Sequence, residues 1–179
     1  MKTDNSHINE KIQLRLLAIK GLKTPRVLDC FSGTGKLWKE VNKIAGKDIE
    51  VLGIEKEKGK NRKALQGDNL KYLPVIDLSL FDVVDLDAYG IPFKQIQILK
   101  KRDYHGIIVV TCIQTGMGQL PNKLLEELGY THEMTKKISS IFNYNGIEKI
   151  KNILYLYGCK YITGYFMGRK NYFLFKFNH

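Results

Sequence analysis

Two carboxylates and an aromatic side chain stand close together in one short segment of the chain. The segment 85–92 reads Asp-Leu-Asp-Ala-Tyr-Gly-Ile-Pro and follows an apolar run. A carboxylate such as that of Asp87 can accept the hydrogen of an amino group and take up the proton that the nitrogen releases when it reacts. The ring of Tyr89 can stack on a planar base. Gly90 and Pro92 favour a tight turn that would hold both groups in place.

A glycine-containing loop earlier in the chain can bring backbone close to a ligand. Residues 26–35 read Arg-Val-Leu-Asp-Cys-Phe-Ser-Gly-Thr-Gly, which predicts a short strand, a loop and then a helix. A Gly-x-Gly turn has no Cβ in the way of a ligand, and it aims the first N–H groups of the next helix at that ligand. A dinucleotide site requires a third glycine three residues on. Trp38 occupies that position, so the loop favours another ligand.

Two further acids follow at intervals that suit a nucleoside. Glu55 ends a second apolar strand about 20 residues after Gly35, a spacing at which a strand-end carboxylate can accept hydrogen bonds from a ribose diol. Because Lys56 follows directly, Glu55 can instead be a surface acid that pairs with its neighbour. Asp68 can accept a hydrogen bond from the amino group of an adenine, or it can simply form a turn.

These two segments carry a resemblance to a known family. The loop at 29–35 resembles the first motif of class I S-adenosylmethionine (SAM)-dependent methyltransferases, in which the loop lies under the methionine part of SAM. Segment 85–92 resembles the motif Asp-x-Asp-Pro-(Tyr/Phe)-Gly-x-Pro of tRNA guanine-N2 methyltransferases, with Ala88 where that family has proline. It also resembles, more loosely, the (Asp/Asn)-Pro-Pro-(Tyr/Phe) motif of amino-directed DNA and RNA methyltransferases. The resemblance spans roughly residues 27–114.

The resemblance implies two sets of site residues. Methyl transfer to an amine requires the nitrogen lone pair to be free and in line with the sulfonium of SAM, which a carboxylate at position 87 would promote. The residues expected at the reacting centre are Asp87, Tyr89 and Asp85. The residues expected to bind SAM are Asp29, Phe31, Ser32, Gly33, Gly35, Glu55, Asp68 and Asp85.

The elements that must position these residues alternate between strand and helix. Apolar runs predict strands at 27–31, 50–55, 64–68, 80–86 and 104–114. Helical spacing and terminators predict helices at 6–20, 36–45, 69–73, 93–101, 119–128, 134–142 and 146–157. Two further runs, 161–167 and 172–177, flank the glycine-containing turn 168–171 and predict a hairpin.

This alternation predicts a mostly parallel sheet with helices on both faces. We therefore expect a single α/β domain over residues 1–179: a Rossmann-like class I methyltransferase fold whose mostly parallel seven-stranded sheet ends in a C-terminal antiparallel hairpin. Ligands of such sheets bind beyond the carboxyl ends of the strands. The N-terminal part, 1–24, is expected to form a helix packed on the sheet edge, with Ser6 as its cap. Its apolar residues are Ile8, Ile12, Leu16, Leu17 and Ile19.

The net charge of +11 favours a polyanionic partner, because a basic surface gains by releasing the counterions condensed on nucleic acid. A lysine-rich proteome or plain solubility is the alternative explanation. The late segment 155–170 mixes tyrosines and Phe166 with lysines and arginine, which suits single-stranded nucleic acid or a hydrophobic core. We favour the core for most of these aromatic residues.

The apolar runs, the cysteines and the histidines indicate in which compartment the protein acts and whether it binds a metal. No apolar run reaches the roughly 20 residues that span a bilayer, and the polar first ten residues do not form a signal peptide. Cys30, Cys112 and Cys159 are far apart, which argues against a disulfide framework or a zinc site and favours a reducing cytoplasm. The histidines are scattered, so we expect no metal.

The sequence therefore predicts a SAM-dependent N-methyltransferase that acts on an exocyclic amino group of a nucleic acid base. RNA is favoured over DNA, with guanine N2 of tRNA as the specific target and tRNA processing as the role. The alternatives are an amino-directed DNA methyltransferase, a nucleic-acid-binding module that kept the fold and lost catalysis, for which Ala88 is the motivating feature, and methylation of a small molecule. The sequence carries no signal for an oligomeric state.

Overall fold

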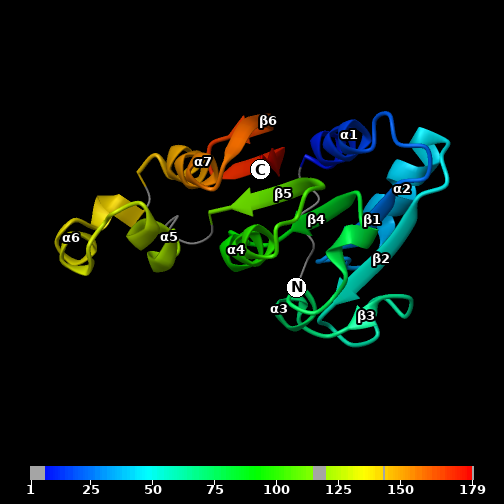
Figure 1. The fold of residues 1–179 in the computed structure, drawn as a ribbon, viewed down its shortest axis with the longest axis horizontal. Coiled ribbons are helices and arrows are strands. Elements are labelled where there is room, and N and C mark those ends of the chain that lie inside the picture. Colours follow the sequence, from blue (N-terminus) through cyan, green and yellow to red (C-terminus); the bar gives the residue numbers. More distant parts are fainter. Residues whose placement is uncertain (1–6, 115–119, 143, 179) are drawn as a thin grey trace.

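The centre of the molecule is a seven-stranded sheet (Figure 1). The computed structural model describes residues 7–114, 120–142 and 144–178. The strands are β1 (Arg26–Asp29), β2 (Glu50–Glu55), β3 (Leu65–Gln66), β4 (Val83–Asp87), β5 (Ile107–Ile113), β6 (Cys159–Met167) and β7 (Lys170–Phe177). Their order is β3-β2-β1-β4-β5-β7-β6. The first five run parallel, and β7 pairs antiparallel with both β5 and β6. The expected sheet and its C-terminal hairpin are confirmed.

Helices cover both faces of this sheet. The helices are α1 (Ile8–Ala18), α2 (Lys36–Ala45), α3 (Asn69–Tyr72), α4 (Phe93–Lys101), α5 (Asn122–Glu127), α6 (His132–Lys137) and α7 (Gly146–Leu156). Buried residues of α1 and α2 form one hydrophobic core, and those of α4, α5 and α7 belong to the other. Neighbouring strand residues alternate between the two: Val83 packs with the first core and Val84 with the second. The central strands are therefore apolar on both sides.

Several predicted boundaries differ from the structure for local reasons. The strand predicted from residue 80 begins at Val83, because residues 78–80 form a 3-10 turn in which the Asp77 side chain accepts the N–H of Ser79. The helix predicted at 134–142 is α6 followed by a separate 3-10 turn, Ser139–Phe142. The helix predicted at 119–128 is α5, and residue 119 lies outside the described residues. The boundaries of α2, β2 and α4 are those predicted.

The first helix buries two basic residues that the predicted apolar series lacks, although Ile12, Leu16 and Ile19 of that series also pack on the core. Its buried residues are Lys11, Leu14, Arg15 and Ala18, which recur at helical spacing and so share one side. Ile8 and Leu17, by contrast, are 39% and 44% exposed. The helix packs on α2 and over β5 and β7, not on the sheet edge as we expected. The predicted cap, Ser6, lies outside the part of the chain that the structure describes.

The late aromatic residues are mostly exposed, which contradicts the expectation of a core. Tyr161 is 82% exposed, and Tyr155, Tyr165 and Phe166 are exposed as well. Tyr161, Tyr165 and Phe166 belong to β6, an edge strand with a neighbour on one side only. Only Tyr157 of this group is half-buried.

The other general expectations concern cysteines and membranes. Cys30, Cys112 and Cys159 are free thiols, and all three are buried. None of the described helices is long and apolar enough to cross a membrane.

Candidate functional site

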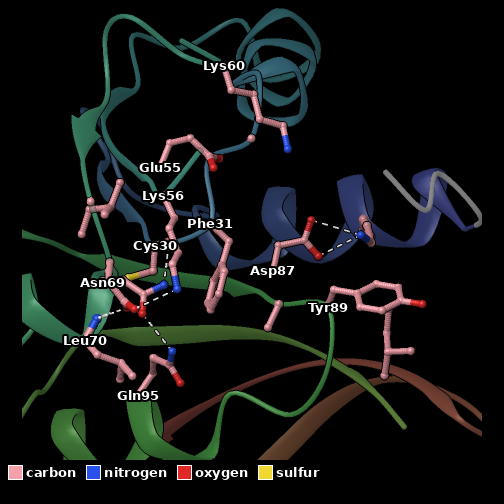
Figure 2. Close-up of a pocket in the computed structure, with 17 residues that line it drawn as sticks. Cys30, Phe31, Glu55, Lys56, Lys60, Asn69, Leu70, Asp87, Tyr89 and Gln95 are labelled. Carbon is pink, nitrogen blue, oxygen red and sulfur yellow. Dashed lines mark hydrogen bonds and ion pairs between the residues drawn. The ribbon is translucent and has the colours of Figure 1, made fainter. Parts of the chain in front are cut away.

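A cavity of about 410 Å³ opens at the carboxyl ends of the parallel strands (Figure 2). Its walls come from the loop after β1, the ends of β2 and β4, and the turn after β3. Figure 2 shows Leu70 and Tyr89 toward opposite ends of this opening. The predicted site residues that line it are Phe31, Gly33, Glu55, Asp68, Asp87 and Tyr89. The ends of the first, second and fourth strands therefore converge on one cavity.

Four predicted site residues are not among those that line the cavity: Asp29, Ser32, Gly35 and Asp85. Asp29 is 5% exposed, and its Oδ1 accepts the N–H of Phe31 at 3.2 Å. Ser32 Oγ accepts from the side chain of Asn61 at 3.3 Å. Asp85 is completely buried. Asp29, Ser32 and Asp85 are thus buried in the structure, and Gly35 is half-buried.

The loop after β1 needs its glycines for its backbone conformation. Gly33 and Gly35 have φ angles of 54° and 72°, values in the left-handed region that side chains disfavour. Gly35 stands directly before α2, and its N–H donates to the carbonyl of Ser32 at 2.7 Å. A third glycine supports the loop from β2: a Cβ on Gly53 would lie 2.8 Å from the Cβ of Ser32. The loop therefore rests directly on the neighbouring strand.

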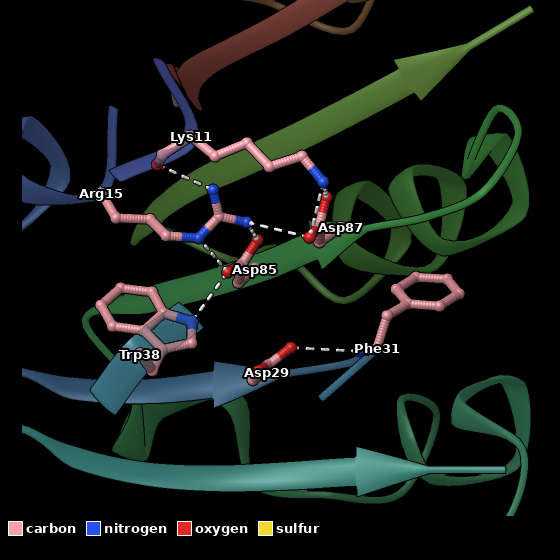
Figure 3. Close-up of polar contacts among 7 residues, drawn as sticks. All are labelled: Lys11, Arg15, Asp29, Phe31, Trp38, Asp85 and Asp87. Atoms are coloured by element: carbon pink, nitrogen blue, oxygen red, sulfur yellow. Dashed lines mark hydrogen bonds and ion pairs between the residues drawn. The ribbon is translucent and has the colours of Figure 1, made fainter. Parts of the chain in front are cut away.

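The carboxylate of Asp87 is held by a lysine from the first helix (Figure 3). Lys11 Nζ lies 2.8 Å from Oδ1 and 3.0 Å from Oδ2 of Asp87. Arg15 Nη2 approaches Oδ2 at 3.9 Å. The Asp87 side chain is 18% exposed, and both it and Lys11 line the cavity. Lys11 therefore pairs with both oxygens of Asp87 at the wall of the cavity.

Asp85, two residues earlier on β4, has a different environment. Arg15 donates to it through Nε and Nη2, each at 2.7 Å, and Trp38 Nε1 donates at 2.7 Å (Figure 3). The remaining guanidinium nitrogen donates to the carbonyl of Lys11 at 2.9 Å. Two parallel bonds between a guanidinium and a carboxylate fix both groups in one geometry. Asp85 therefore anchors α1 and α2 to β4 instead of facing a ligand.

These contacts set the charge of the acids. Burial acts to raise the pKa of Asp87, but the Arg15 guanidinium and the Lys11 ammonium outweigh it and hold that pKa below its ordinary value. Burial, together with the nearby charge of Asp85, raises the pKa of Asp29 well above its ordinary value. Asp87 is therefore an anion at the cavity wall, and Asp29, whose pKa is raised, holds a proton more readily than Asp87 does.

The acids at the other wall have local partners. Oε1 of Glu55 accepts the N–H of Glu57 at 2.8 Å. Lys56 contacts Asp68 at 3.3 Å and not Glu55, so the alternative pairing considered for Glu55 is wrong. Asp68 begins α3 by accepting the N–H of Leu70 at 3.0 Å. That is the turn-forming role, while a contact of Asp68 with adenine stays a prediction.

The structure adds residues that the sequence reasoning missed. Asn69 donates to the carbonyl of Cys30 at 2.7 Å, and Gln95 donates to Asn69 Oδ1 at 2.8 Å. Both amides are buried and line the cavity. Gln95 stands among the buried apolar residues of α4, between Phe93 and Ile96. A polar residue in such a series would have indicated a buried side chain with a specific partner. Lys11 and Arg15 had no such signal, because their partners Asp87 and Asp85 lie 76 and 70 residues away in the sequence.

A metal centre is absent from the described ranges 7–114, 120–142 and 144–178: no group of three or more His, Cys, Asp or Glu side chains there could hold an ion.

Comparisons with known proteins agree on the fold. No protein-family model matches the chain, and no curated protein matches it. The plantazolicin methyltransferase BamL, solved with a triazolic desmethylPZN analog and SAH, is 14% identical over 96% of this chain and 84% of that chain, with a TM-score of 0.58. A SAM-dependent methyltransferase from Archaeoglobus fulgidus is 16% identical over 93% and 92% of the two chains, with a TM-score of 0.55. Phosphoethanolamine N-methyltransferase 2 from Haemonchus contortus is 15% identical over 87% and 37%, with a TM-score of 0.56.

At these identities the likeness shows the fold. The chain has the Rossmann-like class I methyltransferase fold, with strand order 3-2-1-4-5-7-6 and a C-terminal antiparallel hairpin, so the predicted fold class is confirmed. The names of these similar proteins include plantazolicin methyltransferase and phosphoethanolamine N-methyltransferase. One fold supports many substrates, and the tRNA guanine-N2 subfamily is not singled out.

Proposed function

We propose that the chain is a SAM-dependent methyltransferase that transfers a methyl group to an exocyclic amino group of a nucleic acid base. RNA is the favoured substrate, and guanine N2 of tRNA is the favoured position. The observation that carries this proposal is the convergence of Gly33, Glu55 and Asp87 on one cavity at the carboxyl ends of β1, β2 and β4.

The residues of this cavity fit SAM. The turn at Gly33 and Gly35 leaves backbone where a Cβ would otherwise stand, which suits the methionine part. Among the described residues, the only hydrogen bond to the Glu55 carboxylate is that from Glu57, so the second oxygen can accept from a ribose hydroxyl. Buried amides at Asn69 and Gln95 offer groups for the base. When bound, SAM supplies a methyl group on a sulfonium.

Asp87 is suited to receive the target amine. Its lowered pKa keeps it anionic at neutral pH, so it can accept a hydrogen from the amine and take up the proton that is released. To do so it must exchange the ammonium of Lys11 for the substrate nitrogen. Tyr89, 60% exposed at the cavity, provides a ring on which the base can stack.

A labelled methyl donor tests this proposal. The protein is incubated with labelled SAM and, separately, with bulk tRNA, rRNA and DNA. We expect label in RNA, most strongly in tRNA, and nucleoside analysis should identify N2-methylguanosine. Label in DNA alone would favour an amino-directed DNA methyltransferase. If SAM binds but no nucleic acid takes up label, the substrate proposal is wrong.

A second candidate is a nucleic-acid-binding module of this fold without catalysis. It is favoured by the Lys11 ammonium, which lies within 3.0 Å of both oxygens of Asp87, and by the replacement of the motif proline by Ala88. Calorimetry with SAM separates the two candidates, since a pure binding module has no need of SAM and should release no heat with it. A reducing cytoplasm remains the setting that we propose for either candidate.

A further inference from the structure

A second cavity, of about 450 Å³, lies along the outer side of α4. We call it the α4 groove and define it by Lys94, Lys100, Lys101, Lys123, Leu70 and Tyr157. Three of its lysines come from α4 and the fourth from α5. It is therefore a concave surface on which four positive charges gather beside one aromatic ring.

The charges of the groove are not neutralised by the protein. Lys56, Lys60, Lys137 and Lys151 each pair with an acid. Within the described part of the chain, by contrast, no acid forms an ion pair with any of the four groove lysines. The acid beside the groove, Glu127, instead accepts hydrogen bonds from Gln97 and Tyr157. Like charges held together without counterions favour an anionic ligand.

The arrangement of the lysines fits an extended ligand. Lys94 and Lys101 are seven residues apart on one helix, which places them about 10.5 Å apart along its axis. Both are exposed, as is Lys123 on the opposite wall. Lysine is a compact point charge that suits phosphate without demanding one orientation. A chain of successive phosphates matches this row better than a single small anion does.

The groove adjoins the candidate active site. Leu70 lines both cavities, at the end of the first cavity opposite Tyr89 (Figure 2). Helix α4, which supplies three of the groove lysines, begins at Phe93, directly after the loop that carries Tyr89. A nucleic acid strand whose target base enters the first cavity can therefore pass along α4.

From these observations we propose that the α4 groove binds the sugar-phosphate backbone of the substrate nucleic acid. The nucleic-acid identity of this ligand rests on the proposed function. The net charge of +11 supports it. The sequence indicates an attraction to nucleic acid only for the chain as a whole, whereas the groove gives four lysines at which that attraction would act.

Binding of a fluorescent single-stranded RNA, measured by anisotropy without SAM, tests this proposal. The groove variant replaces Lys94, Lys101 and Lys123 by Gln. Lys100 is kept, because its Nζ packs against the ring of Phe177, 5.3 Å from the ring centroid. The control variant replaces Lys20, Lys39 and Lys43 by Gln, which removes the same charge from exposed positions at α1 and α2. The two variants differ only in where the charge is lost.

We expect the groove variant to bind RNA about tenfold or more weakly. Its slope of log K against log salt should fall by about 2, because each lost phosphate contact on a single strand contributes about 0.7. The control should stay within about twofold of wild type. Equal losses in both variants, no loss in the groove variant, or competition by polyglutamate as strong as that by RNA would each overturn the proposal.

A methylation assay on the same variants separates this inference from the proposed function. If wild type methylates RNA and the groove variant does so with unchanged kcat/KM, the groove proposal is wrong and the proposed function stands. If groove-dependent binding is found but no nucleic acid is methylated, the groove proposal stands and the proposed methylation is wrong.

Discussion

Asp85 and Asp87 point to the same side of β4 but have opposite roles in the structure. Asp85 is completely enclosed, and its oxygens are taken by Arg15 and Trp38. Asp87 is at the cavity wall, where Lys11 Nζ lies within 3.0 Å of both of its oxygens. The environment, not the residue type, therefore makes one acid structural and leaves the other available for chemistry.

Replacement of Asp87 by Asn should remove turnover and spare the cofactor. The amide keeps an oxygen for Lys11 but cannot take up the amine proton, so kcat should fall at least about 100-fold. The affinity for SAM should stay within about tenfold, because the lost contact is to the target amine. Methylation kinetics and calorimetry measure the two effects, with the exposed Asp48→Asn as a matched control. An unchanged rate would remove Asp87 from the mechanism.

Replacement of Arg15 by Met should destabilise the fold strongly. The change keeps much of the side-chain volume but leaves the Asp85 carboxyl buried without its main partner, which typically costs about 3–5 kcal/mol. Urea denaturation measures the loss. The double variant Arg15→Met with Asp85→Asn should recover part of it, because the uncompensated charge is gone. A single-variant loss under about 1 kcal/mol would show that the pair contributes little.

Replacement of Asp29 by Asn should stabilise the protein in a pH-dependent way. Because the folded-state pKa of Asp29 is raised, its contribution to stability is fully present below the unfolded pKa and is lost as pH rises through the folded pKa. The gap in Tm between variant and wild type should therefore widen from acid to neutral pH. Each kcal/mol corresponds to about 2–4 °C for a chain of this size. A gap that is constant with pH would contradict the assignment.

At the scale of elements, the structure separates what local patterns determine from what distant partners determine. The bounds of α2, β2 and α4 were predictable because each has its own apolar face and terminators. The buried face of α1 was not, because Lys11 and Arg15 count as exposed in any hydrophobic pattern. Their partners stand 76 and 70 residues away, where no local spacing can reveal them.

The close contact between β2 and the glycine loop gives a test at this scale. An alanine at Gly53 would place its Cβ 2.8 Å from that of Ser32, so the loop must lift. Overpacking of this kind costs about 1–3 kcal/mol, and we expect SAM affinity to fall about tenfold. Val51→Ala, on the same strand at a 40% exposed position, is the control. Equal SAM affinities for the two variants, measured by calorimetry, would show that the loop tolerates the shift.

At the scale of the whole molecule, the candidate site was partly predictable. Strand–helix alternation places the strand ends at one edge, so residues at those ends, such as Glu55 and Asp87, were found as cavity residues. The burial of Asp29 and Asp85 was not predictable. The same rule could not show that these two acids are buried and do not line the cavity, because burial depends on which side chains cover them.

The packing of α1 joins the two ends of the chain. Lys11 Nζ lies 5.7 Å from the ring centroid of Tyr172 on the last strand, and α1 lies over β7 (Figure 1). During synthesis this helix emerges well before β7, so the surface on which it packs is complete only after β7 has emerged. An entirely apolar face would be exposed for that whole interval and would favour aggregation. A face that carries an ammonium and a guanidinium stays hydrated until it packs. It loses that water when Lys11 and Arg15 pair with Asp87 and Asp85.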